Sequence, residues 1–268
     1  YENTKQEAVD TNAERTFDLF SLSAGGDVHL SDTVRMGGTV FRTERAPTTE
    51  ELYSNGPHLA TNQFEVGNPL LNKEVSTGIE AALRYRNGGQ FLTANVFYTD
   101  YKDYIFEMET GGEEDELPIF AFMADNASFK GFEVQGGTDI GTFGGFALKA
   151  DALAEYVRAQ TDTGNLPRIP PLSILTGLEA ESERLFLRAE LDYAAAQNTV
   201  TPLEIPTDSY ALVNLFATWK APMEAQNVRI SLSVLNLLND EARQHTSFLK
   251  DVVPLPGRNI RFSVSTSF

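Results

Sequence analysis

Cysteine is absent from these 268 residues, so the chain has no disulfide, no thiolate metal ligand and no cysteine nucleophile. Basic residues are few: 21 Lys and Arg stand against 38 Asp and Glu, which gives a net charge of −17. This balance argues against nucleic acid as a partner, because a phosphate backbone needs clustered positive charge. There are only three histidines, which leaves little material for nitrogen-rich metal sites or histidine-based catalysis.

Long apolar runs are also missing. None approaches the roughly 18 residues that a membrane-spanning helix requires, so a helical membrane protein is excluded. A spanning strand needs only about 9–11 residues, and only alternate ones face lipid, so a barrel remains open. The chain begins at Tyr1 without a basic or apolar signal segment, and we expect the numbering to start downstream of an export signal.

Alternation of apolar and polar residues with a period of two runs through most of the chain. In the last segment, Ile260, Phe262 and Val264 alternate with Arg261 and Ser263. The same pattern recurs in 79–86, 92–99, 185–193 and 227–236. A soluble sandwich would pack the apolar face, including Val228, Ile230, Leu232 and Val234, on a second sheet, whereas a membrane barrel would turn it toward lipid. Alternation alone does not separate the two.

The connections favour the barrel. We predict about twelve strands, near 1–9, 15–30, 33–46, 73–86, 90–108, 118–139, 143–159, 170–181, 184–197, 208–220, 227–237 and 256–268. The joints after 30, 86, 139, 181 and 220 are short, and those at 47–72, 109–117, 160–169, 198–207 and 238–255 are longer. Strict alternation of short and long joints is typical of outer-membrane barrels, which have tight periplasmic turns and long outer loops.

Aromatic residues gather on one predicted hairpin. They are Phe97, Tyr98, Tyr101, Tyr104, Phe106, Phe120 and Phe122. Rings placed in this way form a girdle at a membrane interface, and ordinary cross-strand pairing is the alternative interpretation. The chain ends in Phe268. A terminal aromatic on a last amphipathic strand resembles the usual ending of bacterial outer-membrane barrels, which implies a native C-terminus.

Three stretches resemble one family of such barrels, the TonB-dependent receptors. Residues 41–53, FRTERAPTTEELY, are similar to the family's FRAPT-x-EELY passage, with Thr43 and Glu44 as two extra residues. Residues 67–74, GNPLLNKE, are similar to its GNPNLKPE run. Residues 235–240, LNLLND, followed by 254–260, PLPGRNI, are similar to its closing strand pair. Their order and spacing make the resemblance specific.

The resemblance implies an all-β, antiparallel transmembrane barrel of 22 strands around an N-terminal plug. Residues 1–268 would form the C-terminal part of that barrel, without the plug. It also implies a receptor in the bacterial outer membrane, in contact with lipid and lipopolysaccharide. The receptor would import a scarce nutrient with energy from the TonB complex, acting through the missing N-terminal part. An isolated barrel of twelve strands is an alternative, since twelve is even. A passive porin-type barrel and a soluble β-rich binding domain are the alternative functions.

A narrower likeness, to zinc-uptake members, rests on residues 51–65 and 245–251. His58 and His245 are nitrogen donors that suit zinc, and Glu65 adds an oxygen, so these three are the predicted metal ligands. The acidic run at 113–116 would concentrate cations. Each feature has a plainer explanation, since a single loop histidine is more often a hydrogen-bonding surface residue and an acidic run is usually solvated. Zinc is the first predicted cargo, and a ferric siderophore or another metal chelate is the second; no intrinsic cofactor is predicted.

No enzyme is predicted. His245 and Ser247 lie in a predicted loop with no obvious orienting carboxylate. Acidic residues are too plentiful for any pair to indicate acid–base catalysis, and no Gly-rich phosphate loop occurs.

Overall fold

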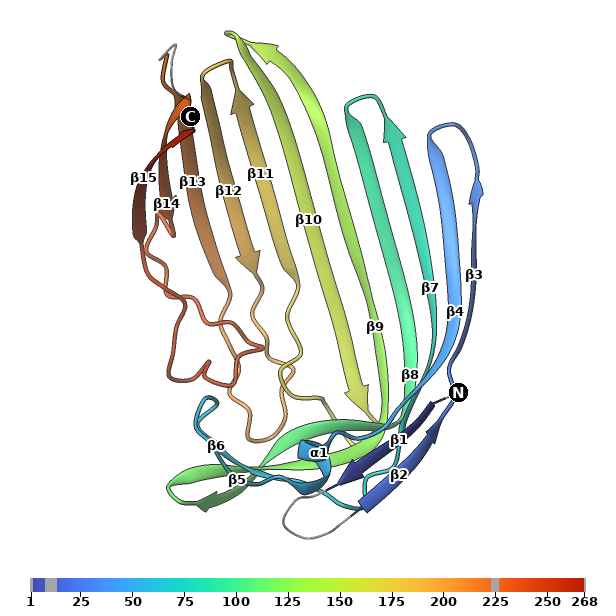
Figure 1. Cartoon of the computed structure of the whole chain (residues 1–268). Coiled ribbons are helices and arrows are strands. Elements are labelled where there is room, and N and C mark those ends of the chain that lie inside the picture. The colour runs from blue at the N-terminus through green and yellow to red at the C-terminus, as the bar shows by residue number, and fades with distance from the viewer. Residues whose placement is uncertain (1, 8–13, 223–226, 268) are drawn as a thin grey trace.

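A computed structural model describes residues 2–7, 14–222 and 227–267. Eleven strands form one antiparallel wall, in the order β3, β4, β7 and then β8 to β15. They are β3 (Leu22–His29), β4 (Val34–Arg45), β7 (Glu74–Asn87), β8 (Gln90–Glu114), β9 (Leu117–Phe143), β10 (Phe146–Thr161), β11 (Ser173–Glu181), β12 (Leu185–Ala194), β13 (Tyr210–Lys220), β14 (Asn227–Leu235) and β15 (Asn259–Ser267). The wall is curved and open, with β3 and β15 as its edges (Figure 1). Over the described ranges, no helix is long and apolar enough to cross a membrane.

The number of wall strands differs from the prediction. Within the predicted first strand, Glu2–Glu7 form β1, which pairs with β2 (Glu14–Leu19) in a separate two-stranded sheet; the rest of that range lies outside the described residues. Over the described residues, the wall therefore has eleven strands instead of twelve. Because neighbours alternate in direction, β3 and β15 run the same way, and joining them would create a parallel seam. The alternative of a self-closed, all-antiparallel barrel is thus wrong for this sheet.

The convex face of the wall is apolar and uncovered. Leu232 pairs across strands with Phe262, and the Phe262 residue is 67% exposed. Among the described strands outside the wall, β2 packs near Ile105 of β8 and β6 (Gln63–Val66) pairs with β9, both at the long-loop end, and the large apolar side chains of this face stay exposed. The soluble sandwich is therefore wrong, and the alternating apolar side chains form the belt that a membrane barrel presents to lipid.

The concave face is polar, as the alternation predicted. Arg188 donates two hydrogen bonds to Asp151, at 2.6 and 2.9 Å, and one to Glu190, at 2.7 Å. Its guanidinium lies flat over Gly177, where a Cβ would come within 2.3 Å of Nη2. A side chain at this glycine would push Arg188 off the wall and away from its carboxylates.

The two ends of the wall differ as the joint lengths predicted. Short turns occupy one end and long segments the other (Figure 1). One prediction here is wrong: the joint at 109–117 is mostly strand, since β8 and β9 continue through it and turn tightly at Asp115 and Glu116, whose φ angles are 53° and 63°. Two successive residues with positive φ suit a tight hairpin. A bulge at Asp103, with φ 55°, marks the register shift in β8 where its outer part begins.

Part of the predicted aromatic cluster packs in a small core instead of forming a membrane girdle, whereas Tyr98 is 42% exposed. Tyr101 and Tyr104 lie with their ring centroids 5.0 Å apart, and the Phe129 ring is 5.2 and 5.0 Å from them. They surround a small core that includes Ala127 and Leu166. The alternative interpretation, packing of aromatic rings between strands, therefore holds for these residues. Phe268 lies outside the described residues.

Candidate functional site

The long segment between β4 and β7 is held at both ends by one arginine, Arg45. Arg45, the last residue of β4, donates to Glu51 at 2.9 Å and to Glu74, the first residue of β7, at 3.1 Å. Between them, Thr48 caps the short helix α1 (Thr49–Tyr53) and forms a reciprocal capping box with Glu51. The RAPT-x-EELY and LNKE residues thus meet in space, and their role is to hold this segment.

A second ion pair and a small apolar core strengthen this clamp. Lys73 donates to the buried Glu44 at 2.5 Å, and Glu44 also accepts from the backbone N–H of Phe20 at 2.9 Å. The core residues are Phe17, Leu19, Ala46, Leu52, Leu71 and Ile105. They come from β2, the loops on both sides of α1, α1 itself and β8, so β2 is packed onto the same body.

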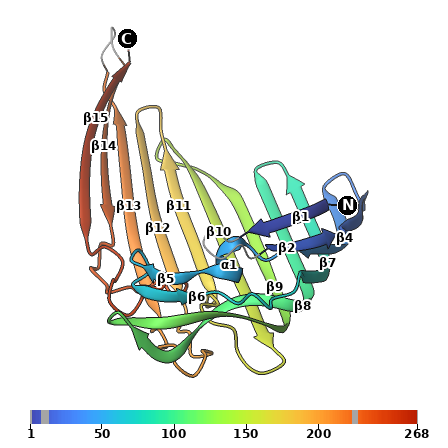
Figure 2. The ribbon, with the colours of Figure 1, turned by 60° about the horizontal axis from the view of Figure 1, so that its bottom comes forward.

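The clamp positions a hairpin across the mouth of the wall. β5 (Asn55–His58) pairs with β6 (Gln63–Val66), and β6 adds in parallel to the outer part of β9, with Phe64 opposite Ile119. Figure 2 shows α1, β5 and β6 lying across the long-loop end of the wall. Because β6 is joined to β9 by backbone pairing, the hairpin has a defined position above the polar concave face.

His58 lies at the end of β5 with its imidazole half-exposed, at 52% of the side chain. Its Nδ1 lies 2.5 Å from Glu65 Oε1 and 3.0 Å from Thr61 Oγ1. An ionised carboxylate only accepts hydrogen bonds, and the Thr61 hydroxyl donates its proton to the His58 carbonyl at 3.1 Å. Nδ1 therefore carries a hydrogen and donates it, so that the neutral form of the ring has its lone pair on Nε2.

Behind this pair lies a buried polar relay. Gln63 Nε2 donates to Glu65 Oε1 at 3.1 Å and to Glu107 Oε1 at 2.6 Å. Burial raises the pKa of Glu107 to about 7, although Arg168, 3.8 Å away, opposes the shift. Arg168 also donates to the backbone carbonyl of Glu107 at 3.3 Å. The relay thus extends from the exposed imidazole to the next outer loop.

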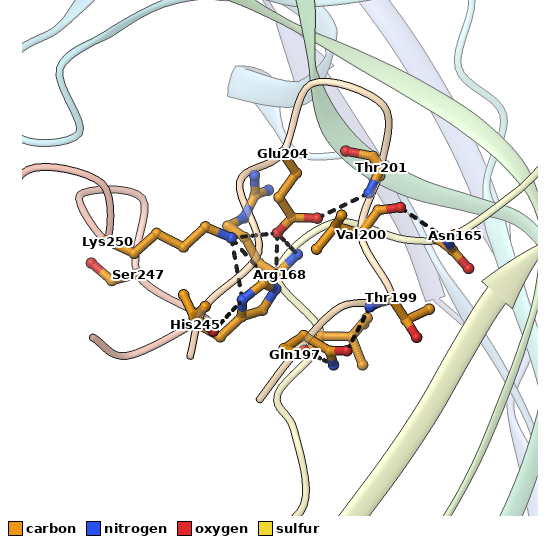
Figure 3. A network of polar contacts seen from close by, with 12 residues as sticks. Asn165, Arg168, Gln197, Thr199, Val200, Thr201, Glu204, His245, Ser247 and Lys250 are labelled. Carbon is orange, nitrogen blue, oxygen red and sulfur yellow. Dashed lines mark hydrogen bonds and ion pairs between the residues drawn. The ribbon is translucent and has the colours of Figure 1, made fainter. Parts of the chain in front are cut away.

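His245 lies in a different, buried cluster (Figure 3). Its Nδ1 is 2.9 Å from Thr207 Oγ1 and its Nε2 is 3.1 Å from Glu204 Oε1. Lys250 donates to the same Glu204 oxygen at 2.6 Å. Burial alone would raise the pKa of Glu204, but the hydrogen bonds from His245 and Lys250 hold it at about 2.

This cluster joins three outer loops. Glu204 also accepts from the backbone N–H groups of Arg168, at 2.8 Å, and Thr201, at 3.2 Å. The order Thr207, His245, Glu204 superficially has the form of a nucleophile, base and acid. Thr207 and His245 are only 6% and 2% exposed, however, and the Glu204 side chain is 7% exposed, so the oxygen of Thr207 is enclosed. We interpret the cluster as the fastening of the loops that follow β10, β12 and β14.

Of the three predicted metal ligands, the structure brings together His58 and Glu65, and places His245 apart in the buried cluster. Within the described ranges, no group of three or more His, Cys, Asp or Glu side chains is arranged to hold a metal. Sequence reasoning missed Gln63, Glu107 and Glu204. Gln63 and Glu107 are 44 residues apart, and no local sequence pattern predicts their contact. Zinc remains a prediction.

Comparison with known proteins identifies the fold and its relatives. The family model described as "TonB dependent receptor-like, beta-barrel" matches residues 1–237. The chain is 26% identical, over 90% of its length, to the hemoglobin and hemoglobin-haptoglobin-binding protein of Haemophilus ducreyi, and 25% identical, over 96%, to TonB-dependent heme receptor A of Haemophilus influenzae. Among solved structures, the copper transporter OprC is similar with a TM-score of 0.81 at 20% identity, over 97% of this chain and 41% of that one.

The ferric enterobactin receptor of Pseudomonas aeruginosa is similar in fold, with a TM-score of 0.65, 18% identity, and 96% of this chain covered against 41% of that one. The chain spans 29% and 38% of the two curated relatives. These relatives are receptors, binding proteins and transporters, not enzymes. The convex apolar belt, the polar concave face and the matching family model agree. The chain therefore belongs to the TonB-dependent receptor β-barrel family, whose members reside in the outer membrane of Gram-negative bacteria.

Proposed function

We propose that this chain is the wall and part of the ligand vestibule of an active importer for a metal-bearing nutrient. The observation that carries the proposal is His58, an exposed imidazole at the end of β5, a strand that lies across the long-loop end of the wall (Figure 2). The energy would come from the TonB complex through a plug domain, because the wall contains no energy-converting site in its described part. Nutrients of this kind are too scarce to be gathered by diffusion alone.

The arrangement of His58 supports a metal as the recognised group. A metal-ligating histidine almost always donates its other ring N–H to a carboxylate or carbonyl, which fixes the tautomer and raises the basicity of the donor nitrogen. Glu65 fills that role at 2.5 Å, and Nε2 is the donor nitrogen. An anionic or purely apolar ligand would gain nothing from a nitrogen lone pair that points toward it.

Zinc is the first candidate, with His58 supplying one of about four ligands. Since the described residues hold no group of three donors around it, the others would come from the rest of the receptor. Haem is the second candidate, favoured by a separate observation: a single imidazole is sufficient as an axial ligand of haem iron. The names of the Haemophilus relatives, which refer to heme and hemoglobin, point the same way.

The test uses the full-length receptor in a strain that lacks other high-affinity importers for zinc and haem. We expect His58→Ala to abolish growth at limiting supply of one of the two nutrients and not the other. Deletion of TonB should have the same effect as the variant. His29→Ala is the matched control, because His29 lies at the opposite, short-turn end of the wall. Unchanged growth of His58→Ala on both nutrients would contradict the proposal.

A passive porin is the alternative that the wall alone permits. The two differ in their energy requirement. Uptake that persists at the same rate without TonB, together with swelling of liposomes containing the full-length receptor, would favour the porin. Dependence on TonB and closed liposomes are the results that we expect.

A further inference from the structure

We infer that Gln63 is a positioning residue of the ligand site, one that fixes which nitrogen of His58 is offered to the ligand. This inference rests on the proposed function, and it adds a residue that no sequence motif indicated. Gln63 does not contact the ligand-facing nitrogen; it acts through Glu65.

The Gln63 amide has one possible orientation. Its side chain is enclosed, with the residue 1% exposed, and its Nε2 donates to Glu65 at 3.1 Å and to Glu107 at 2.6 Å. Rotation of the amide by 180° would put its oxygen against Glu65 Oε1, which accepts from His58, and two facing acceptor oxygens repel each other. In the present orientation Oε1 is buried and has no hydrogen-bond partner among the described residues. The two bonds to carboxylates therefore outweigh the cost of leaving one acceptor unpaired.

The same geometry fixes Glu65. Its Oε1 accepts from both Gln63 and His58, so the carboxylate is held between two donors. Without Gln63, Glu65 would keep a single donor, on a half-exposed side chain, and could turn toward water. His58 would then lose the acceptor that keeps its proton on Nδ1, and the Nε2 lone pair would be available only part of the time.

The anchor of Gln63 lies in the barrel wall and not in the loop. Glu107 belongs to the outer part of β8, and Arg168 contacts both its backbone carbonyl, at 3.3 Å, and its carboxylate, at 3.8 Å. The position of His58 is thereby fixed relative to β8 through Glu65 and Gln63. A histidine in a mobile loop would lack this connection to a wall strand, and its Nε2 would not point in one fixed direction.

The experiment reads the tautomer without any ligand. Full-length receptor labelled with ¹⁵N-histidine is studied by solid-state NMR in lipid, and the signals lost in His58→Ala identify His58. In the unmodified receptor we expect a protonated Nδ1 and an unprotonated Nε2. In Gln63→Met, which keeps the volume but removes both donors, we expect this order to be lost. A Gln63→Met spectrum identical to that of the parent would overturn the inference.

A double-mutant cycle then connects the tautomer with binding, using Zn²⁺ and haemin as probes. We expect Gln63→Met to weaken binding of the probe that depends on His58 by about tenfold, the lower end for outer-shell partners. In the His58→Ala background the same change should have no further effect, whereas a general structural role would lower affinity in both backgrounds. If neither probe depends on His58, the proposed function fails, while the NMR result still decides the role of Gln63.

Two further variants protect the interpretation. Gln197→Met is the matched control, since Gln197 also makes two loop hydrogen bonds, to the Ile169 carbonyl and from the Thr199 N–H, and does not contact His58. It should leave the tautomer unchanged. If Gln63→Met does not assemble, Glu107→Ala removes the shorter of the two Gln63 bonds without altering Gln63, and the same loss of tautomer order is expected.

Discussion

Replacing Glu204 by Gln should release the outer loops from one another. The carboxylate is the acceptor for Lys250, His245 and the backbone of Arg168, and its side chain is 7% exposed. The variant keeps the shape but leaves the buried Lys250 ammonium without a counter-charge. Removing one partner of a buried ion pair costs about 3–5 kcal/mol.

The lower end of that range sets the expected magnitude. A loss of about 3 kcal/mol in the free energy of loop opening corresponds to a roughly 100-fold higher opening equilibrium. Hydrogen exchange of the full-length receptor, followed by mass spectrometry, measures this directly. We expect protection to fall by about that factor in residues 162–172, 195–209 and 236–258, and to stay unchanged in the wall strands.

A double variant separates charge from shape. Glu204→Gln combined with Lys250→Met removes both charges and keeps an acceptor oxygen for the backbone N–H groups of Arg168 and Thr201, and replacement of both partners of a buried ion pair is often neutral. It should restore most of the protection lost in Glu204→Gln. If Glu204→Gln leaves exchange in all three loops unchanged, the buried cluster does not hold them, and our interpretation of His245 as part of a fastening is refuted.

Three further predictions concern other parts of the outer region. Acidification from pH 8 to pH 5 should strengthen hydrogen-exchange protection around Glu107 by up to about 3 kcal/mol. The pKa of Glu107 in the folded protein, about 7, lies above the ordinary 4.5, so folding favours the protonated form. Glu107→Gln should abolish this pH dependence. Asn236→Ala should destabilise the last loop by about 2–4 kcal/mol. The buried amide of Asn236 bonds to Asp240 and Pro256, and its backbone has a φ of 50°, which alanine disfavours. Asn236→Gly tolerates this φ and should lower hydrogen-exchange protection less. Arg45→Met should expose the segment after β4 to external protease; because Arg45 is 40% exposed, we expect only about 1–2 kcal/mol of local destabilisation.

Much of the wall could be predicted from the sequence, because its two faces are encoded locally. Alternation with period two reports which side chains face lipid, and it needs no knowledge of distant residues. The pattern 260–264 predicted that Ile260 and Phe262 share a face, and they pair with the apolar Val234 and Leu232 of β14. Joint lengths likewise predicted which end carries the long segments. The strand count was wrong by one, since Glu2–Glu7 have the composition of a strand but pair with β2 outside the wall.

The outer region was harder to predict, for a physical reason. Residues 109–117 contain two glycines and a run of acidic side chains, a composition typical of loops, yet cross-strand pairing carries them to the hairpin tip at Asp115. His245 was expected to face a ligand. It is buried instead, because its partners Thr207 and Glu204 come from another loop about 40 residues away. Such convergence depends on how loops meet above the wall, and no local pattern records it.

The position of Arg45 has a consequence for how this receptor can change. The Arg45 guanidinium joins the end of β4 to Glu74, the first residue of β7. The 28 residues between them therefore leave and re-enter the wall at one ion-paired point. The turn between β5 and β6, residues 59–62, can change in length while Arg45 and the pairing of β6 with β9 keep the strands in register. Residues that carry part of the family resemblance then hold this segment, and the sequence of the turn between β5 and β6 is free to vary.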